Sequence, residues 1–154
     1  QGRIAKEAKN YRLLSQAWTL AAEDEKSIPA LQEAARLSSE GELNLRLGNA
    51  YLNLSQYSNC ESAIREGLRK GKIKSPDNAN ISLGMCLYNQ KKYRDSITAF
   101  REAGKTSRSS RISRQWIRVI ESDIERNRQI QLAESAARKQ LQELAERRRA
   151  TERI

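Results

Sequence analysis

Two stretches decide the fold: NLRLGNAY at residues 44–51 and NISLGMCL at residues 80–87 are copies of one pattern, 36 residues apart. Each copy has Leu-Gly at its centre, and each is followed by a tyrosine in a short polar turn and by a small-x-x-x-large pair. These following residues are Tyr57, Cys60 and Ile64 in the first copy, and Tyr93, Ser96 and Phe100 in the second. Self-similarity at a period of this length is the signature of helical repeat architectures.

The order of small and large residues has a packing reason. Gly48 and Gly84 remove the side chain where the first helix of a pair must approach the second closely. Ile64 and Phe100 are the large residues that fill the space towards the next repeat, at helical spacing. The turns between the helices are short enough to require antiparallel pairs. A generic helical bundle would explain amphipathic helices, but it would not explain the recurrence of the pattern at one offset.

A weaker third copy precedes these two. Its first half is Tyr11, Leu14, Ser15 and Trp18, and its second half is Ser27, Leu31 and Ala34. We therefore expect an all-α fold, an α-α superhelix of about three helix-turn-helix repeats over residues 8–40, 41–76 and 77–109. Gly71 suits a helix C-terminus and Pro76 the start of the next helix, while Pro29 is expected near the start of its helix.

The chain changes character near Ser110. Apolar residues at three- and four-residue spacing predict a helix over 110–128 that caps the last repeat, with Trp116 as its largest contact. These residues are Ile112, Trp116, Val119, Ile120 and Ile124. Residues 129–154 read as an extension of this helix into a long basic helix, which ends near Arg147, Arg148 and Arg149. Its narrow apolar stripe predicts either self-association as a coiled coil or a partly frayed end.

Composition excludes several functions. The 154 residues carry a formal net charge of +10, contain no histidine, and include 31% charged residues. Without histidine the commonest general base is missing, so we expect no enzyme. Two cysteines without histidine make no zinc site, and we expect no metal or cofactor. No apolar run is long enough to form a transmembrane segment. The chain begins at Gln1 rather than methionine, so we expect it to belong to a longer protein, whose upstream part the sequence does not reveal.

The two cysteines leave two readings open. Cys60 and Cys86 both fall on helix faces expected inside the repeats, where a free cysteine packs as a small apolar residue. A disulfide is the alternative, and it requires Cα atoms within about 7 Å of each other.

The repeated residues resemble the tetratricopeptide signature W-x-x-L-G-x-x-Y followed by A-x-x-x-F, with asparagine at the tryptophan position in both of the stronger copies. Within that superfamily the chain resembles periplasmic repeat proteins associated with TonB transport systems of Gram-negative bacteria. The matching segments are residues 28–38, 41–48, 67–76, 83–85, 99–103 and 115–126. The resemblance implies a periplasmic, non-catalytic scaffold that assists TonB-dependent uptake through protein contacts. Without it we would expect a cytoplasmic protein.

The resemblance also implies where partners bind, which is the concave groove lined by the first helix of each pair. The residues expected there are Arg12, Gln16, Thr19, Glu42, Leu45, Asn49, Asn53, Ile81, Met85, Tyr88 and Asn89. Such a surface suits an extended or helical peptide. The best-known ligand site of the superfamily, a clamp for two carboxylates of chaperone tails, would need a Lys–Arg pair on the third first helix. This chain has Asn78 and Ser82 there, so we do not expect chaperone-tail binding.

The basic C-terminal helix supports an alternative function, binding of nucleic acid or of an anionic envelope surface. Four glutamates interrupt the basic residues of that helix: Glu134, Glu143, Glu146 and Glu152. No aromatic residue is available there to stack on bases. We therefore expect a protein or peptide partner and no nucleic acid.

Overall fold

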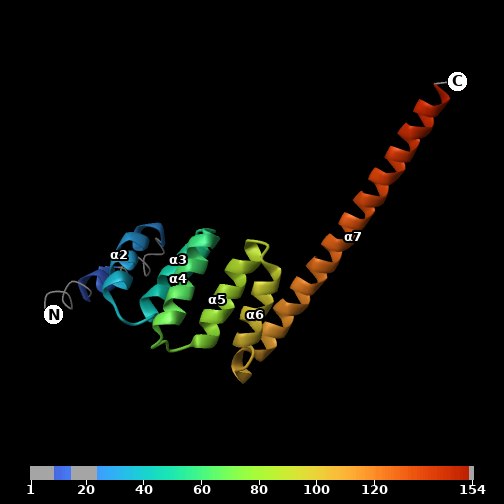
Figure 1. Ribbon diagram of the computed structural model, residues 1–154. Coiled ribbons are helices and arrows are strands. Elements are labelled where there is room, and N and C mark those ends of the chain that lie inside the picture. The colour runs from blue at the N-terminus through green and yellow to red at the C-terminus, as the bar shows by residue number, and fades with distance from the viewer. Residues whose placement is uncertain (1–8, 15–23, 153–154) are drawn as a thin grey trace. The chain divides into compact units, whose positions relative to one another are not determined.

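The computed structural model describes residues 9–14 and 24–152. Residues 9–14 are helical, and the helices that follow are α2 (Asp24–Leu37), α3 (Glu42–Asn53), α4 (Tyr57–Lys70), α5 (Pro76–Asn89), α6 (Tyr93–Ala103) and α7 (Ser107–Thr151). These described ranges contain no strand. The chain divides into two compact units, residues 1–117 and 118–154, and each is described by itself. In the first unit α2 to α6 lie side by side, with α3–α4 and α5–α6 as the two predicted antiparallel pairs (Figure 1).

The two turns inside these pairs repeat the same hydrogen bonds 36 residues apart. In the first turn Ser55 N–H donates to Leu52 O and Gln56 N–H donates to Tyr51 O. In the second, Lys91 N–H donates to Tyr88 O and Lys92 N–H donates to Leu87 O. The middle residues Ser55 and Lys91 both have a left-handed backbone, with φ of 58° and 61°. The repeat read from the sequence is therefore a repeat of backbone geometry as well.

The glycines of the repeat work as predicted inside each pair. A Cβ on Gly48 would lie 2.3 Å from the Ile64 side chain, and one on Gly84 would lie 2.7 Å from the Phe100 ring. The small residue Ser96 donates a hydrogen bond of 2.7 Å to Gly84 O. Ile64 and Phe100 thus pack against the glycine of their own helix pair. The sequence pattern had predicted that these two side chains fill the space towards the next repeat. Phe100 also reaches onward, because its ring stacks on Trp116 with centroids 5.4 Å apart.

Helix ends follow the sequence signals with one exception. Helix α4 ends before Gly71, whose φ is 72°, and α5 begins at Pro76. Pro29, however, lies inside α2 as the sixth residue of the helix, and not near its start. Ser15 and Trp18, which the sequence assigns to the first half of the weakest repeat, lie outside the described residues.

The start of α7 is held against α5 by a buried carboxylate. Asp77 is 6% exposed and accepts hydrogen bonds from Ser109 Oγ at 2.6 Å and from Arg108 Nη2 at 3.0 Å. The hydrogen bond from Ser109 lowers the pKa of Asp77, and the hydrogen bonds and positive charge of Arg108 lower it further. Burial acts in the opposite direction, and the resulting pKa is about 2. The carboxylate therefore stays ionised and joins the last repeat to the helix that follows it.

The predicted cap is one face of α7 and differs in detail from the expectation. Trp116, predicted as the largest contact of the cap, stacks on Phe100, but Ile112 and Val119 are 39% and 47% exposed. The buried positions of α7 are Ser109, Ser113, Ile120 and Asp123. The sequence pattern had assigned five apolar residues to the packed face, yet two of its buried positions are serines. The small side chains allow α7 to approach closely there: a Cβ on Gly104 would lie 3.1 Å from Ser113 Cβ.

The second unit is the remainder of α7, which runs unbroken to Thr151. There is no helix break at residue 110 or 129, so the predicted cap and basic extension form one continuous helix. Residues 125–152 are exposed, including the apolar residues Ile130, Leu132, Leu141 and Leu144.

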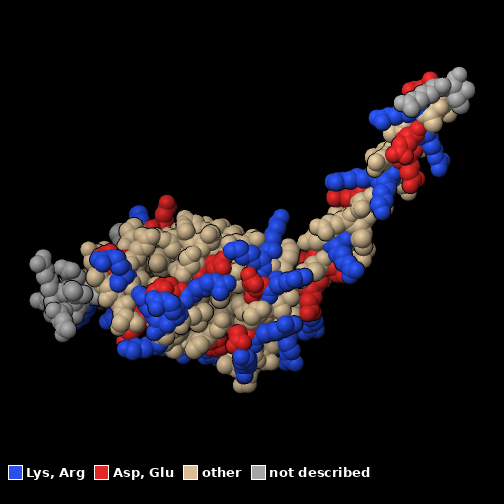
Figure 2. Space-filling model, viewed as in Figure 1, with Lys and Arg blue, Asp and Glu red and all other residues tan. Residues whose placement is uncertain are grey.

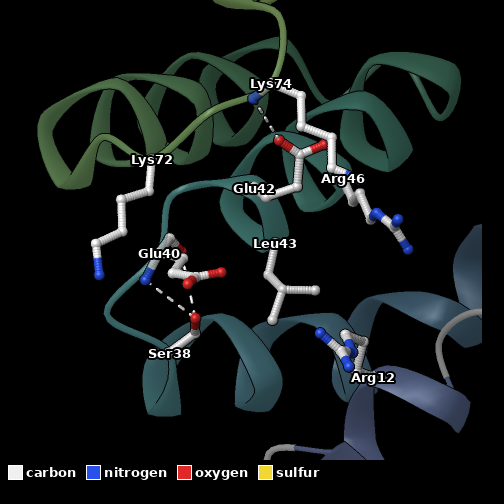
Figure 3. Close-up of a pocket in the computed structure, with 8 residues that line it drawn as sticks. All are labelled: Arg12, Ser38, Glu40, Glu42, Leu43, Arg46, Lys72 and Lys74. Atoms are coloured by element: carbon white, nitrogen blue, oxygen red, sulfur yellow. Dashed lines mark hydrogen bonds between the residues drawn. The ribbon is translucent and has the colours of Figure 1, made fainter.

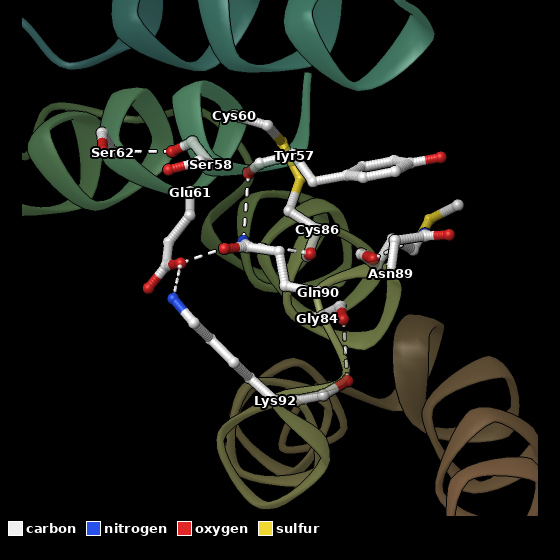
Figure 4. The surroundings of a disulfide bond; sticks show 12 residues. Tyr57, Ser58, Cys60, Glu61, Ser62, Gly84, Cys86, Asn89, Gln90 and Lys92 are labelled. Atoms are coloured by element: carbon white, nitrogen blue, oxygen red, sulfur yellow. Dashed lines mark hydrogen bonds and ion pairs between the residues drawn. A yellow bond between two sulfur atoms is a disulfide. The ribbon is translucent and has the colours of Figure 1, made fainter. Parts of the chain in front are cut away.

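The cysteines are joined. A disulfide links Cys60 of α4 to Cys86 of α5, with Cα atoms 6.2 Å apart, and both residues are fully buried. Figure 4 shows this bond beside Gln90, whose side-chain amide donates to Tyr57 O and to the Glu61 carboxylate. Lys92 pairs with the same carboxylate at 2.8 Å. The two helix pairs are therefore connected covalently, and polar contacts lie alongside the bond.

Candidate functional site

Helices α3 and α5, the first helices of the two strong repeats, enclose an open hollow that we call the groove hollow. Its volume is about 250 Å³. Helix α3 contributes Glu42, Leu45, Arg46 and Asn49, and the opposite wall is formed by Lys74, Ser75, Asn78, Ala79 and Ser82, with Ile64 also in its lining. The hollow exists because first helices of successive repeats lie side by side, which brings residues about 30 positions apart to a common surface.

A second hollow adjoins it, which we call the loop hollow. It has a volume of about 270 Å³ and lies among the α2–α3 turn, α3 and the α4–α5 loop (Figure 3). Its lining residues are Arg12, Ser38, Glu40, Glu42, Leu43, Arg46, Lys72 and Lys74. Glu42, Arg46 and Lys74 line both hollows, so the two form one continuous surface. Small-molecule sites usually have volumes of about 300–1,000 Å³ and mostly apolar walls, whereas these hollows are smaller and open, and their walls mix polar and apolar residues.

The α4–α5 loop is fixed to the beginning of α3 by two hydrogen bonds. Gly41 N–H donates to Gly71 O at 2.8 Å, and Lys74 N–H donates to the Glu42 carboxylate at 3.2 Å. A Cβ on Gly41 would lie 2.0 Å from Gly67 O, so only glycine permits the close approach between the start of α3 and the end of α4. Since Gly71 and Lys72 both have positive φ, the loop turns sharply out of α4. These contacts fix the backbone of the loop that carries Lys72 and Lys74.

The predicted groove residues divide between two faces. Glu42, Leu45 and Asn49 line the groove hollow, and Arg12 lines the loop hollow. Asn53 is exposed at the end of α3. Gln16 and Thr19 lie outside the described residues.

On α5 the residues that line the groove hollow are Asn78, Ala79 and Ser82, not the four that were predicted there. Ile81 and Met85 are half-buried, and Asn89 is exposed with its side chain bonded to Met85 O. Tyr88 contacts the aromatic rings of Tyr93 and Trp116 at centroid distances of 5.9 and 5.5 Å. One side of α5 thus faces the preceding first helix, and Tyr88 points to the helix that follows.

The sequence-based set missed Arg46, Lys72 and Lys74. The available signal was the basic run Lys70-Gly71-Lys72-Ile73-Lys74 in a loop between repeats, because loops supported by a rigid scaffold often carry binding residues. Arg46 gave no such signal, since a lone arginine on a helix is usually a solvated surface residue.

Some of the charge on the surface is paired. On the face shown in Figure 2, basic and acidic side chains are interleaved. Several are ion pairs one helical turn apart, such as Arg65 with Glu61 and Lys105 with Glu102. Within the described ranges, no group of three or more His, Cys, Asp or Glu side chains is placed to hold a metal ion. Among those same residues, no helix is both long and apolar enough to cross a membrane.

Comparison with known structures defines the fold. The second TPR domain of human RPAP3, solved with the HSP70 peptide SGPTIEEVD, is similar with a TM-score of 0.68 and 13% identity over 77% of this chain and 98% of that one. MamA is similar with a TM-score of 0.69 and 13% identity, over 77% and 68% of the two chains. The first TPR of Spaghetti (RPAP3), bound to the HSP90 peptide SRMEEVD, has a TM-score of 0.69 and 12% identity, over 78% and 94%. Neither a protein-family model nor a curated protein sequence matches the chain.

The fold of the chain follows from these matches. The chain has the all-α solenoid fold of tetratricopeptide-repeat domains, with a long C-terminal helix. At such low identity the likeness defines the fold alone, and any partner must be argued from the surface of this chain.

Proposed function

We propose that this chain is a non-catalytic scaffold that binds a peptide segment of a partner protein in the groove between α3 and α5. The observation that carries the proposal is the groove hollow, whose walls present the side chains of Asn49, Asn78 and Ser82. Amide and hydroxyl groups of this kind can bond both N–H and C=O groups of an extended main chain. Within the described residues, none of these three side chains has a hydrogen-bond partner.

We further propose that the scaffold works in the bacterial periplasm, as an accessory component of a TonB-dependent uptake system. Two observations support this. The segments named above resemble periplasmic proteins of such systems. The disulfide between Cys60 and Cys86 supports an oxidising compartment, because structural disulfides are rare where thiols are kept reduced.

Site-specific photo-crosslinking in the native cell envelope tests both parts. A photo-reactive amino acid replaces Asn49 or Ser82 in the groove, and a control protein carries it at Arg94, which is exposed on α6. We expect TonB-system components to be captured from the groove positions and not from Arg94. Capture of protein from the groove without any TonB-system component would refute the uptake role, whereas no groove-specific capture would refute the scaffold itself.

The exposed part of α7 offers a second contact, and we propose that it mediates self-association. The exposed apolar residues Ile130, Leu141 and Leu144 are spaced so that they fall on one side of the helix, as in a coiled-coil seam. Analytical ultracentrifugation of the chain with and without residues 129–154 tests this. We expect the longer chain to be dimeric and the shorter one monomeric. A monomer in both cases would exclude the seam, and binding of nucleic acid at physiological salt would favour an electrostatic role for the helix instead.

A further inference from the structure

The exposed part of α7 carries two series of residues in which the members are seven positions apart. The two series are Ile130, Ala137 and Leu144, and Glu134, Leu141 and Arg148. They alternate at intervals of four and three residues, so together they form one line along the helix, as the a and d positions of a heptad repeat do. All six residues are exposed, and we call them the α7 stripe.

Two charges interrupt the α7 stripe, and they have opposite signs. Glu134 precedes the leucines of the stripe and Arg148 follows them. Each has an opposite charge four residues further along its own helix, Arg138 and Glu152, and these neighbours are the same whatever α7 binds. In Figure 2 side chains of both signs lie along this part of α7. A second helix packed on the stripe must therefore accommodate a carboxylate and a guanidinium at two defined positions.

A parallel pair of α7 helices would bring like charges together. In that orientation each residue of the stripe faces its own copy at the same height, so Glu134 meets Glu134 and Arg148 meets Arg148. Like charges placed opposite each other in an interface repel strongly. The two ends of the stripe therefore both oppose the parallel orientation.

An antiparallel pair matches the stripe to itself, because each residue of one series then faces a residue of the other. When Leu141 faces Leu144 of the second copy, twofold symmetry repeats the contact and four leucines lie at the centre. In this register Ala137 faces Arg148 of the second copy, and Glu134 lies about one helical turn from that arginine. The small alanine leaves the arginine side chain room to reach the carboxylate, and symmetry forms this ion pair twice.

The other charges near the stripe agree with this register. The arginines that flank the stripe, Arg138 and Arg147, face the uncharged Ala145 and Gln140 of the second copy, so no like charges meet. A shift of the register by seven residues would separate the leucines and place both stripe charges against apolar side chains, where burial of a charge is unfavourable.

We propose that the exposed part of α7 pairs in antiparallel orientation with the same segment of a second copy of this chain, with Leu141 and Leu144 of both copies at the centre and Glu134 of each copy beside Arg148 of the other. The inference rests on the proposed self-association and specifies its partner, orientation and register. The stripe covers about three heptads, which is near the lower limit for a coiled coil, so the charges at its ends weigh in the choice of orientation. The repeats of the two copies are then attached at opposite ends of the paired segment.

Charge exchange at the two charged stripe positions tests the inference in the full chain. Sedimentation measures the dimer dissociation constant of the wild type, of E134R and R148E, and of the double variant E134R/R148E. The matched control K139E/E146R exchanges the same kinds of charge on the side of the helix opposite the stripe. Circular dichroism of each variant shows whether the helix is kept.

We expect each single exchange to weaken the dimer roughly tenfold, because it replaces two attractive contacts by repulsive ones. The double variant should recover to within about threefold of the wild type, since opposite charges face each other again across the two copies. Inside its own helix the double variant places like charges beside Arg138 and Glu152, so this recovery has to come from contacts between copies. The control should dimerise like the wild type.

A spin label at position 131 measures the orientation directly. The label is attached to the variant Q131C without reductant, so that Cys60 and Cys86 stay joined and only the new cysteine reacts. In the proposed register the two labels are separated by roughly 35 Å along the helix axis, at 1.5 Å per residue. In a parallel pair they lie within about 20 Å, because packed helix axes are only about 10 Å apart.

Several results would overturn the inference. A label distance below about 20 Å would show a parallel pair and leave the proposed self-association standing. A double variant that dimerises no better than the single ones would remove the contact between Glu134 and Arg148, and equal weakening by K139E/E146R would assign the effect to general charge. A trimer or larger assembly would exclude the twofold pair. If the wild type is monomeric throughout, the proposed self-association fails together with the inference.

Discussion

Reduction of the disulfide between α4 and α5 should weaken the fold by a predictable amount. The bond joins Cys60 and Cys86 across a sequence separation of 26 residues. In the chain-entropy treatment, a cross-link of this span lowers the entropy of the unfolded chain by about 12 cal/mol/K, or about 3.5 kcal/mol of unfolding free energy at room temperature. Both cysteines are fully buried, so the reduced thiols also remain in an apolar region without a new partner.

Urea unfolding followed by far-UV circular dichroism measures this effect. With a slope of about 2 kcal/mol/M, the loss corresponds to a fall in the urea midpoint of roughly 2 M on full reduction. The variant C60A/C86A is the control, because its midpoint should not respond to reductant. Two reactive thiols after denaturation without reductant would show that the bond does not form. A midpoint shift below about 0.3 M in a protein shown to be oxidised would refute the entropic reasoning.

Three further perturbations test the packing. Gly84→Ala places a methyl 2.7 Å from the buried Phe100 ring. We expect the free energy of unfolding, measured in urea, to fall by about 1 kcal/mol, because overpacking outweighs the gain in helix propensity. An unchanged free energy would show that the ring can move. Lys91→Gly relieves a left-handed turn with φ of 61°; a gain of up to about 1 kcal/mol is expected, and a lower melting temperature would contradict it. Asp77 has its pKa lowered from 3.8 to about 2 in the fold, so its stabilisation is present above pH 3.8 and is lost as the pH falls towards 2. Asp77→Asn should therefore be less stable at neutral pH and show a flatter acid unfolding curve over that interval; parallel curves would argue against the assigned role.

Local patterns allowed the helices to be located from the sequence. Leu-Gly at residues 47–48 and 83–84 predicted the two strong helix pairs, and Gly71 and Pro76 predicted where one helix ends and the next begins. These signals work because they depend on backbone freedom and on side-chain spacing along a single helix. The prediction from Pro29 was wrong because a proline is compatible with a helix start but does not require one.

The face that a helix presents was harder to predict. On α5 the groove is lined by Asn78, Ala79 and Ser82, and Tyr88 turns to the following helix. On α7 the serines at 109 and 113 are buried, whereas Ile112 is partly exposed. Which side of a helix packs depends on how closely its neighbours approach, and close approach favours small residues over large apolar ones.

The sequence by itself determined that this protein is a helical repeat, where its strong pairs and turns lie, and that it lacks the histidines on which much catalysis relies. Only the tertiary structure decided that Cys60 is joined to Cys86, that Asp77 is held by the start of α7, and that Arg46 and Lys74 line the same hollow. Each of these relations joins residues 26 to 32 positions apart in the chain. Periodicity fixes which residues share one helix face, but the partners of that face are set by how successive helices stack, and no local pattern records that arrangement.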